Sequence, residues 1–501
     1  MATPPVPVTG LRSVMRDVAK TKTGLVGLAM LAFLLGLVLL VPFIAPYDVV
    51  RSWRDREPWV DNPRDAAPDW SEIFSGKQQV RTQIFSPCSA PGPRPPDFNL
   101  AVPMSTVNQK EKCPGGPWQK IAVRVTEAGN YTFIEMTHTF AVTADVFPSE
   151  MSMSVWSNYS TNAPQVTVTW HRPDNVNYTL LQVVPHERVP VRNFYPLSTD
   201  DTIKGQVRNW AIATFNATDA SLIRPEVTLF ANAGRDMLDT RRATVLKGLY
   251  TMTVEIVSAG YVGMDAKVVI FGTVYGAAGT DSSRRDLLVG LLWGAPVALA
   301  FGTVAAVVIV VLQTFLGALA TWYGGWWDEV VQRAADVLLI IPLLPILLLI
   351  AIVYSPSIWY ILLVLVAFGF VGTTTKVARS IVLQVKEEAY IEAAISYGAS
   401  RSRILLKHIL PRLMPYTFAL IALSVPAFIF LEASLSFLGF GDPLLPSWGA
   451  ILGQAYNGNA AFRGFWWWIA LPAGGIVFAT VAFALLGYSF DKVLNPRLRE
   501  Q

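Results

Sequence analysis

The residues whose types and spacing best suit a specific task lie at 386–411, in the string KEEAYIEAAISYGASRSRILLKHILP. Good helix formers at 386–397 predict a first helix, and Gly398 is placed to end that helix in a left-handed conformation. Ser400 is placed to cap a second helix, and we expect Pro411 to terminate it. The spacing therefore predicts two short helices joined at a glycine.

The second of these helices is amphipathic and basic. Ile404 and His408 lie one turn apart on it, and its charges come from Arg401, Arg403 and Lys407. Such a helix suits binding to a partner protein rather than a chemical reaction. The simpler alternative is a basic loop at a membrane surface, which would need neither Glu-Ala-Ala nor a glycine at this spacing.

The same residues resemble a known family. Glu392-Ala393-Ala394, Gly398 and Leu410-Pro411 resemble the EAA loop of ATP-binding-cassette importer permeases. The surrounding residues resemble the second permease subunit of the dipeptide/oligopeptide branch, through Arg379, Tyr390, His408 and Ile409. The resemblance implies that the loop docks into a groove on a separate cytoplasmic ATPase and couples ATP hydrolysis to transport. The implied coupling residues are Glu392, Ala393, Ala394, Gly398, Arg401, His408 and Pro411.

Residues for catalysis or metal binding are not evident. Serine, histidine and aspartate residues form no recognisable nucleophile motif, and the four histidines are scattered, which argues against a metal site. No G-x-x-x-x-G-K-[ST] string occurs, so we expect no cofactor on this chain, with ATP and Mg²⁺ bound by partner subunits. The chain is therefore expected not to be an enzyme. Two alternatives, a membrane receptor or adhesin and an enzyme at the outer membrane face, would not need the EAA-like loop.

The composition indicates a membrane protein. Of the 501 residues 52% are hydrophobic and only 15% are charged, and the mean hydropathy is +0.40. These values are typical of a polytopic membrane protein with a sizeable soluble part. The net charge of +4 and the lack of a basic tail argue against a nucleic-acid partner.

Six apolar runs are candidate membrane spans, and the first is long enough to cross a bilayer core of about 30 Å. They are 24–46, 297–320, 337–354, 359–375, 416–438 and 466–488, and Pro296 is expected to separate the second from the apolar piece 287–295. Basic residues before the first run and within 376–412 place both segments in the cytoplasm, together with the C-terminus. The first run is too long for a cleaved signal peptide. A membrane interface is predicted at Trp322, Tyr323, Trp326 and Trp327.

A large segment between the first two runs, 48–278, differs in kind. Apolar and polar residues alternate at 151–155, 166–170 and 250–256, which predicts strands with one buried face. We expect a sandwich-like β-rich domain at 118–275 and an irregular, proline-rich stretch at 49–117. The expected organisation is 1–47 with the first helix, 48–278 as the insertion, and 279–501 as the permease core. Ordinary members of the family lack such an insertion.

Topology places this insertion outside the cell, and two further features agree. Cys88 and Cys113 could form a disulfide across the proline-rich stretch. Four candidate N-glycosylation acceptors all fall within the insertion, at Asn130, Asn158, Asn177 and Asn216.

Two positions carry open questions. Gly279-Thr280-Asp281 resembles the family string GTD-x-x-GRD, but Arg284 replaces its second glycine and puts the expected tight turn in doubt. Glu432 lies within the fifth run, where a carboxylate usually faces a partner or a water-filled path. Together with Ser436 it is a candidate for the translocation path, and the alternative is a locally paired carboxylate near the outer surface.

Together these features predict a mainly α, polytopic protein with six transmembrane helices in the importer permease fold, plus an extracellular β-rich inserted domain. The resemblance implies the permease subunit of an importer for di- or oligopeptides, with oligosaccharides as the alternative cargo. The implied partners are a second permease subunit, two ATPase subunits, an extracellular substrate-binding protein and membrane lipid.

Overall fold

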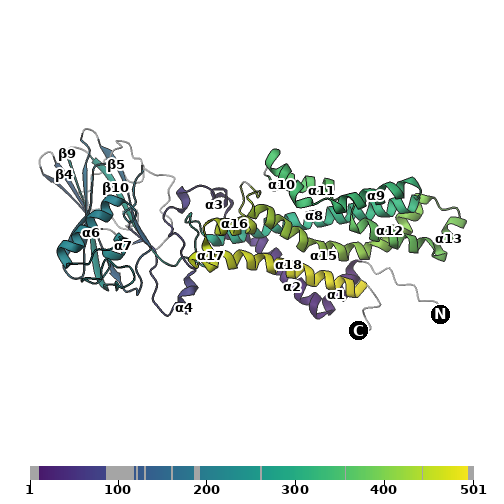
Figure 1. Ribbon diagram of the computed structural model, residues 1–501, viewed down its shortest axis with the longest axis horizontal. Helices are drawn as coiled ribbons and strands as arrows, with labels where there is room; N and C mark the ends of the chain where they lie inside the picture. Colours follow the sequence, from purple (N-terminus) through teal and green to yellow (C-terminus); the bar gives the residue numbers. More distant parts are fainter. Residues whose placement is uncertain are drawn as a thin grey trace. The chain divides into compact units, whose positions relative to one another are not determined.

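The computed structural model describes residues 11–85, 118–119, 122–128, 131–159, 162–185, 192–259, 262–355, 357–442 and 444–494. The chain divides into two compact units (Figure 1). Met1–Asp55 and Leu287–Gln501 form a helical unit, and Arg56–Asp286 forms a β-rich unit that starts and ends later in sequence than the expected range 48–278.

The helical unit is built from long apolar helices and several shorter ones. In chain order they are α1 (Leu11–Lys20), α2 (Lys22–Ile44), α3 (Tyr47–Arg51), α8 (Leu287–Tyr323), α9 (Trp326–Ile340), α10 (Leu343–Val353), α11 (Ile358–Phe368), α12 (Thr373–Lys386), α13 (Ala389–Ser396), α14 (Arg401–Ile404), α15 (Leu410–Phe437), α16 (Trp448–Asn457), α17 (Ala460–Arg463) and α18 (Trp466–Leu494). Small residues at their contacts let the backbones approach closely, and a Cβ at Gly302 of α8 would lie only 2.6 Å from Ile429 of α15. The buried core of α2, α8, α15 and α18 is accordingly rich in alanine.

Five stretches of the described chain are each long and apolar enough to cross a membrane, and a bent pair makes a sixth if it counts as one span. That pair is α9 and α10, which meet at 78°, so the expected run 337–354 begins inside α9 and crosses the bend. The expected break at Pro296 is wrong, because α8 continues through it as one 37-residue helix. Packing against neighbouring helices makes an internal proline tolerable in an apolar segment.

The β-rich unit contains two five-stranded sheets. One has the order β2-β1-β10-β5-β8 and the other β3-β4-β9-β6-β7. Their strands are β1 (Gln83–Phe85), β2 (Trp118–Gln119), β3 (Ala122–Ala128), β4 (Tyr131–Val142), β5 (Glu150–Tyr159), β6 (Gln165–His171), β7 (Asn177–Val183), β8 (Arg192–Tyr195), β9 (Gly248–Ala259) and β10 (Val262–Phe271). The predicted strands at 151–155, 166–170 and 250–256 are confirmed, and their alternating residues enter one buried core that includes Met153, Trp170 and Tyr250.

Two parts of this unit differ from expectation. The stretch 49–117 is not wholly irregular, because β1 pairs with β10 through Ile84 and Val269. A three-residue strand is too short to show alternation, so only its long-range partner reveals it. Helix α6 (Asp201–Phe215) was not predicted either, although Asp200 caps it and Ile203, Val207 and Ala211 are buried at helical spacing.

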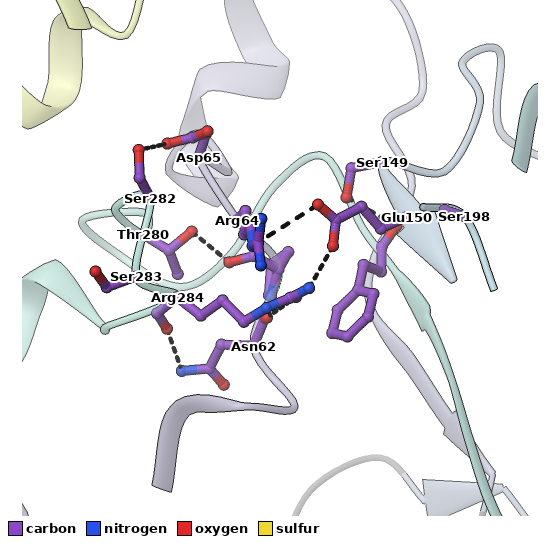
Figure 2. Close-up of polar contacts among 12 residues, drawn as sticks. Asn62, Arg64, Asp65, Ser149, Glu150, Ser198, Thr280, Ser282, Ser283 and Arg284 are labelled. Carbon is purple, nitrogen blue, oxygen red and sulfur yellow. Dashed lines mark hydrogen bonds and ion pairs between the residues drawn. The ribbon is translucent and has the colours of Figure 1, made fainter. Parts of the chain in front are cut away.

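The turn before α8 is formed despite the arginine at its key position, which removes the doubt raised by the sequence (Figure 2). Arg284 has a φ of +67°, a conformation that glycine adopts without strain and other residues adopt at a cost of about 1–2 kcal/mol. Its side chain offsets this cost: it donates to the Asn62 carbonyl at 2.7 Å, pairs with Glu150 and lies 4.0 Å over the Phe271 ring. Burial lowers the pKa of the Arg284 guanidinium, and the facing Glu150 carboxylate opposes that shift.

Candidate coupling site

The segment 386–411 contains the expected pair of helices, with shifted ends. Helix α12 runs to Lys386, and α13 begins only at Ala389, after a break at Glu387 and Glu388. Gly398 then has a φ of +76°, so the predicted left-handed conformation between two helices is confirmed. The predicted cap is confirmed too, because Ser400 Oγ accepts a hydrogen bond from the Arg403 backbone at 3.4 Å.

The second helix does not end at Pro411, and that expectation is wrong. After α14, residues Leu405–Ile409 form a π-helical turn that leads directly into α15. Proline lacks an N–H and its ring crowds the carbonyl of the preceding turn, but it is tolerated in the first turn of a helix. Pro411 lies in the first turn of α15, directly after the π turn. The chain from Arg401 to Phe437 is therefore one continuous helical stretch, which connects the glycine-linked segment to a candidate membrane span.

The helix pair α13–α14 has one face packed against the rest of the helical unit and one face exposed. Ile391, Ile404 and Ile409 are buried, in a cluster that also contains Val382 and Val385 of α12. The outward face includes Glu392, Ala393, Gly398 and Arg401, whereas Ala394, His408 and Pro411 are partly buried. Tyr397, directly before the glycine, is 92% exposed. In Figure 1, α13 lies at the end of the helical unit opposite α16 and α17.

A tryptophan that sequence alone assigned to a membrane interface holds this pair in place. Trp322, near the end of α8, donates its Nε1–H to the carbonyl of Arg401 at 2.9 Å. Lys386 lies 5.6 Å from the centre of the Trp322 ring and donates to the Thr321 carbonyl. The neighbouring Trp326 and Trp327 remain 66% and 62% exposed, as expected of interface residues.

A second connection joins the base of the segment to α9. Arg379 of α12 donates to both carboxylate oxygens of Asp328, at 3.0 and 3.1 Å. Asp328 also accepts from the Thr321 hydroxyl at 3.3 Å, so α8, α9 and α12 share one polar network. Sequence reasoning assigned no role to Asp328, and a lone acidic residue at the start of a helix gives no signal of a partner 51 residues away.

Glu432 is locally paired inside the helical unit. The Ser436 hydroxyl donates to Glu432 Oε1 at 2.6 Å, and the Glu432 residue is 1% exposed. Ser434 bonds back to the Phe430 carbonyl at 2.7 Å and does not join them. The geometry thus matches the locally paired alternative, and a place in the translocation path stays a prediction.

The remaining sequence-derived sites lie in the insertion. Cys88, Cys113 and Asn130 fall outside the described residues, and for Asn158 only the backbone, in β5, is described. Asn177 and Asn216 are both exposed. Within the described residues no group of three or more histidine, cysteine, aspartate or glutamate side chains could hold a metal ion.

Comparison with known proteins covers both ends of the helical unit. Residues 313–500 match the family described as binding-protein-dependent transport system inner membrane component, and residues 10–58 match the N-terminal transmembrane domain of oligopeptide transport permease C.

Individual relatives agree with these matches. The oligopeptide transport system permease protein OppC of Bacillus subtilis (strain 168) is 34% identical over 223 residues, which are 44% of this chain and 72% of the relative. The dipeptide transport system permease protein DppC of the same organism is 33% identical, over 44% of this chain and 68% of the relative. The glutathione transport system permease protein GsiD of Escherichia coli O6:K15:H31 is also 33% identical, over 44% and 72%. The chain therefore belongs to the family of binding-protein-dependent transport system inner membrane components, in the branch of oligopeptide transport permease C.

Proposed function

We propose that this chain is one of two permease subunits of an ATP-driven importer of di- or oligopeptides. Relatives named as oligopeptide and dipeptide permeases support the cargo class. The assembly would contain a second permease subunit, two ATPase subunits and an external substrate-binding protein. ATP and Mg²⁺ would bind to the ATPase subunits, because this chain has no phosphate-binding G-x-x-x-x-G-K-[ST] string.

The observation that best supports this proposal is the glycine-linked helix pair α13–α14. Its outward face would dock on an ATPase subunit, through Glu392, Ala393, Gly398 and Arg401 together with the exposed Tyr397. Its inward face is packed against α12, so we expect the pair and α12 to move together. ATP-driven closure of the ATPase subunits would displace them.

Two routes would carry the displacement to the spanning helices. The continuous stretch Arg401–Phe437 leads from α14 straight into α15. The hydrogen bond from Trp322 to the Arg401 carbonyl connects α14 to the end of α8. Because α8 and α15 also pack closely at Gly302, the two routes act on the same pair of helices. A change at α13–α14 would thereby alternate access to the pathway.

The distribution of basic residues supports one orientation in the membrane. Seven basic residues at 376–412 would place α13–α14 in the cytoplasm, with both termini on the same side. The β-rich unit would then be extracellular, where a disulfide between Cys88 and Cys113 and glycans on the exposed Asn177 and Asn216 are chemically reasonable.

The test is to purify the chain with its partner subunits, reconstitute the complex in lipid nanodiscs and identify the ligand on the copurified binding protein by mass spectrometry. We expect two ATPase subunits in the complex and a peptide as ligand, with ATP hydrolysis stimulated by the loaded binding protein. A complex without ATPase subunits would overturn the importer assignment. An oligosaccharide ligand would overturn only the cargo class.

A further inference from the structure

An apolar turn stands out on the β-rich unit. It consists of Trp70, Ile73 and Phe74, which lie on the short helices η2 (Asp69–Ser71) and α4 (Glu72–Ser75). Ile73 and Phe74 are each 80% exposed, more than the other large apolar side chains described in this unit, and Trp70 is 38% exposed. The Trp70 and Phe74 rings pack edge to face with centroids 6.2 Å apart. Adjacent large apolar side chains this exposed mark a contact with something other than water.

The apolar turn is held in a fixed position. Trp70 Nε1–H donates to the Ala277 carbonyl at 2.8 Å, and the Asp69 N–H donates to the Gly276 carbonyl at 2.8 Å. Glu72 accepts from the Gln79 N–H at 3.0 Å, which closes the far side of the turn. The exposed side chains therefore project from an ordered base rather than from a loose loop.

That base continues directly into a membrane-spanning helix. Only the segment from Ala277 to Leu287 separates the hydrogen-bonded turn from the start of α8. This segment is itself fixed to the same base, because Thr280 donates to the Pro63 carbonyl and Ser282 donates to Asp65, both at 2.8 Å (Figure 2). Ten residues reach at most about 35 Å, so the base of the apolar turn lies within that distance of the first residue of α8.

The chemistry of the turn suits a lipid interface. Tryptophan is enriched where headgroups meet acyl chains, and tryptophan and phenylalanine are common on the apolar face of interfacial helices. The partly exposed, hydrogen-bonded indole of Trp70 beside the phenyl ring of Phe74 fits that boundary. The neighbouring acidic groups do not make the surface strongly negative, because Arg81 faces Asp69 at 3.8 Å and Glu72 at 3.9 Å. Anionic lipids would therefore not be repelled.

We propose that Trp70, Ile73 and Phe74 insert into the interface of the membrane that the chain spans. The inserted domain then has a lipid contact in addition to its covalent connections to α2 and α8. The occupant of the apolar turn is lipid, not another subunit.

The experiment uses the full chain, assembled with its partner subunits in nanodiscs of phosphatidylcholine and phosphatidylglycerol. Ile73→Cys and Phe74→Cys are labelled separately with a nitroxide, and collision with oxygen and with a water-soluble nickel chelate is measured. Leu222→Cys and Leu249→Cys are matched controls, because these leucines are 63% and 62% exposed in the same unit. The parent chain is first treated with the nitroxide reagent to test whether its own cysteines react. If they do, both are replaced, as Cys88→Ser and Cys113→Ser, in every variant.

We expect the ratio of oxygen to nickel accessibility to be several-fold higher at 73 and 74 than at 222 and 249. Ratios equal to those of the controls would place the apolar turn in water and overturn the proposal. Low accessibility to both reagents at 73 and 74 would show that protein covers the turn, which also overturns it. Repeating that measurement on this chain without its partners would then identify whether the cover comes from another subunit.

Discussion

Replacing Gly398 by valine would test whether α13–α14 couples ATP hydrolysis to transport. Gly398 has a φ of +76°, and a Cβ at this position would meet no atom within 4 Å. The added Cβ therefore meets no steric clash, and the main effect expected of the substitution is on the backbone energy. An L-residue in the left-handed conformation costs about 1–2 kcal/mol, and a β-branched residue lies at the upper end. That cost lowers the population of the native angle between α13 and α14 by a factor of about 5–30.

We expect the substitution to impair coupling rather than folding. The site is exposed and a Cβ there meets no atom within 4 Å, so Gly398→Val is expected to insert normally and to assemble. In nanodiscs that contain the partner subunits, basal ATP hydrolysis should persist while the peptide taken up per ATP falls several-fold. Gly398→Ala should give an intermediate value, because alanine carries the left-handed cost without β-branching.

A matched control distinguishes the effect of the position of Gly398 from the effect of backbone strain alone. Gly439 follows α15, has a φ of +96° and likewise has no atom within 4 Å of a Cβ built there. It lies at the opposite end of α15 from the coupling pair, so Gly439→Val should have a similar backbone cost and leave coupling closer to that of the parent. Uptake per ATP by Gly398→Val equal to that of the parent would refute the coupling role of this pair.

Four further predictions concern other contacts. Trp322→Phe removes the hydrogen bond to Arg401, which contributes about 1 kcal/mol. Peptide uptake per ATP should fall in this variant, whereas Trp327→Phe, at an exposed tryptophan, should leave it unchanged. Equal uptake per ATP by the two variants would show that the hydrogen bond from Trp322 to Arg401 has no role in coupling. Arg284→Ala keeps the positive φ and loses the Glu150 pair, so it should lower the melting temperature more than Arg284→Gly, which relieves about 1–2 kcal/mol of strain. The prediction fails if the alanine variant melts no lower than the glycine variant. Joining Asp55 to Leu287 removes the whole β-rich unit, and the ends are close because Trp53 lies against Gly290. The variant should insert, and its complex with the ATPase subunits should hydrolyse ATP but capture the binding protein less well. Unchanged capture would assign the insertion another role. Finally, the native mass should show Cys88 and Cys113 joined, and two free thiols would exclude the disulfide.

Features set by short stretches of sequence could be predicted. Apolar runs identified the candidate spans because about twenty apolar residues have few stable environments other than a bilayer. Alternation identified β5, β6 and β9, since one face of each strand is buried. The left-handed Gly398 and the Ser400 cap were correct for the same reason, because both depend on the geometry of a few adjacent residues.

Features that depend on distant partners could not be predicted. Pro296 and Pro411 lie inside helical stretches, because packing and a π turn outweigh the local tendency of proline to end a helix. Trp322 reaches a carbonyl 79 residues away, and no property of its own neighbourhood distinguishes it from the exposed Trp326. Local sequence thus determined the spans, the strands and the glycine-linked pair. Only the tertiary structure decided which helices the pair contacts, because that depends on contacts between segments far apart in the chain.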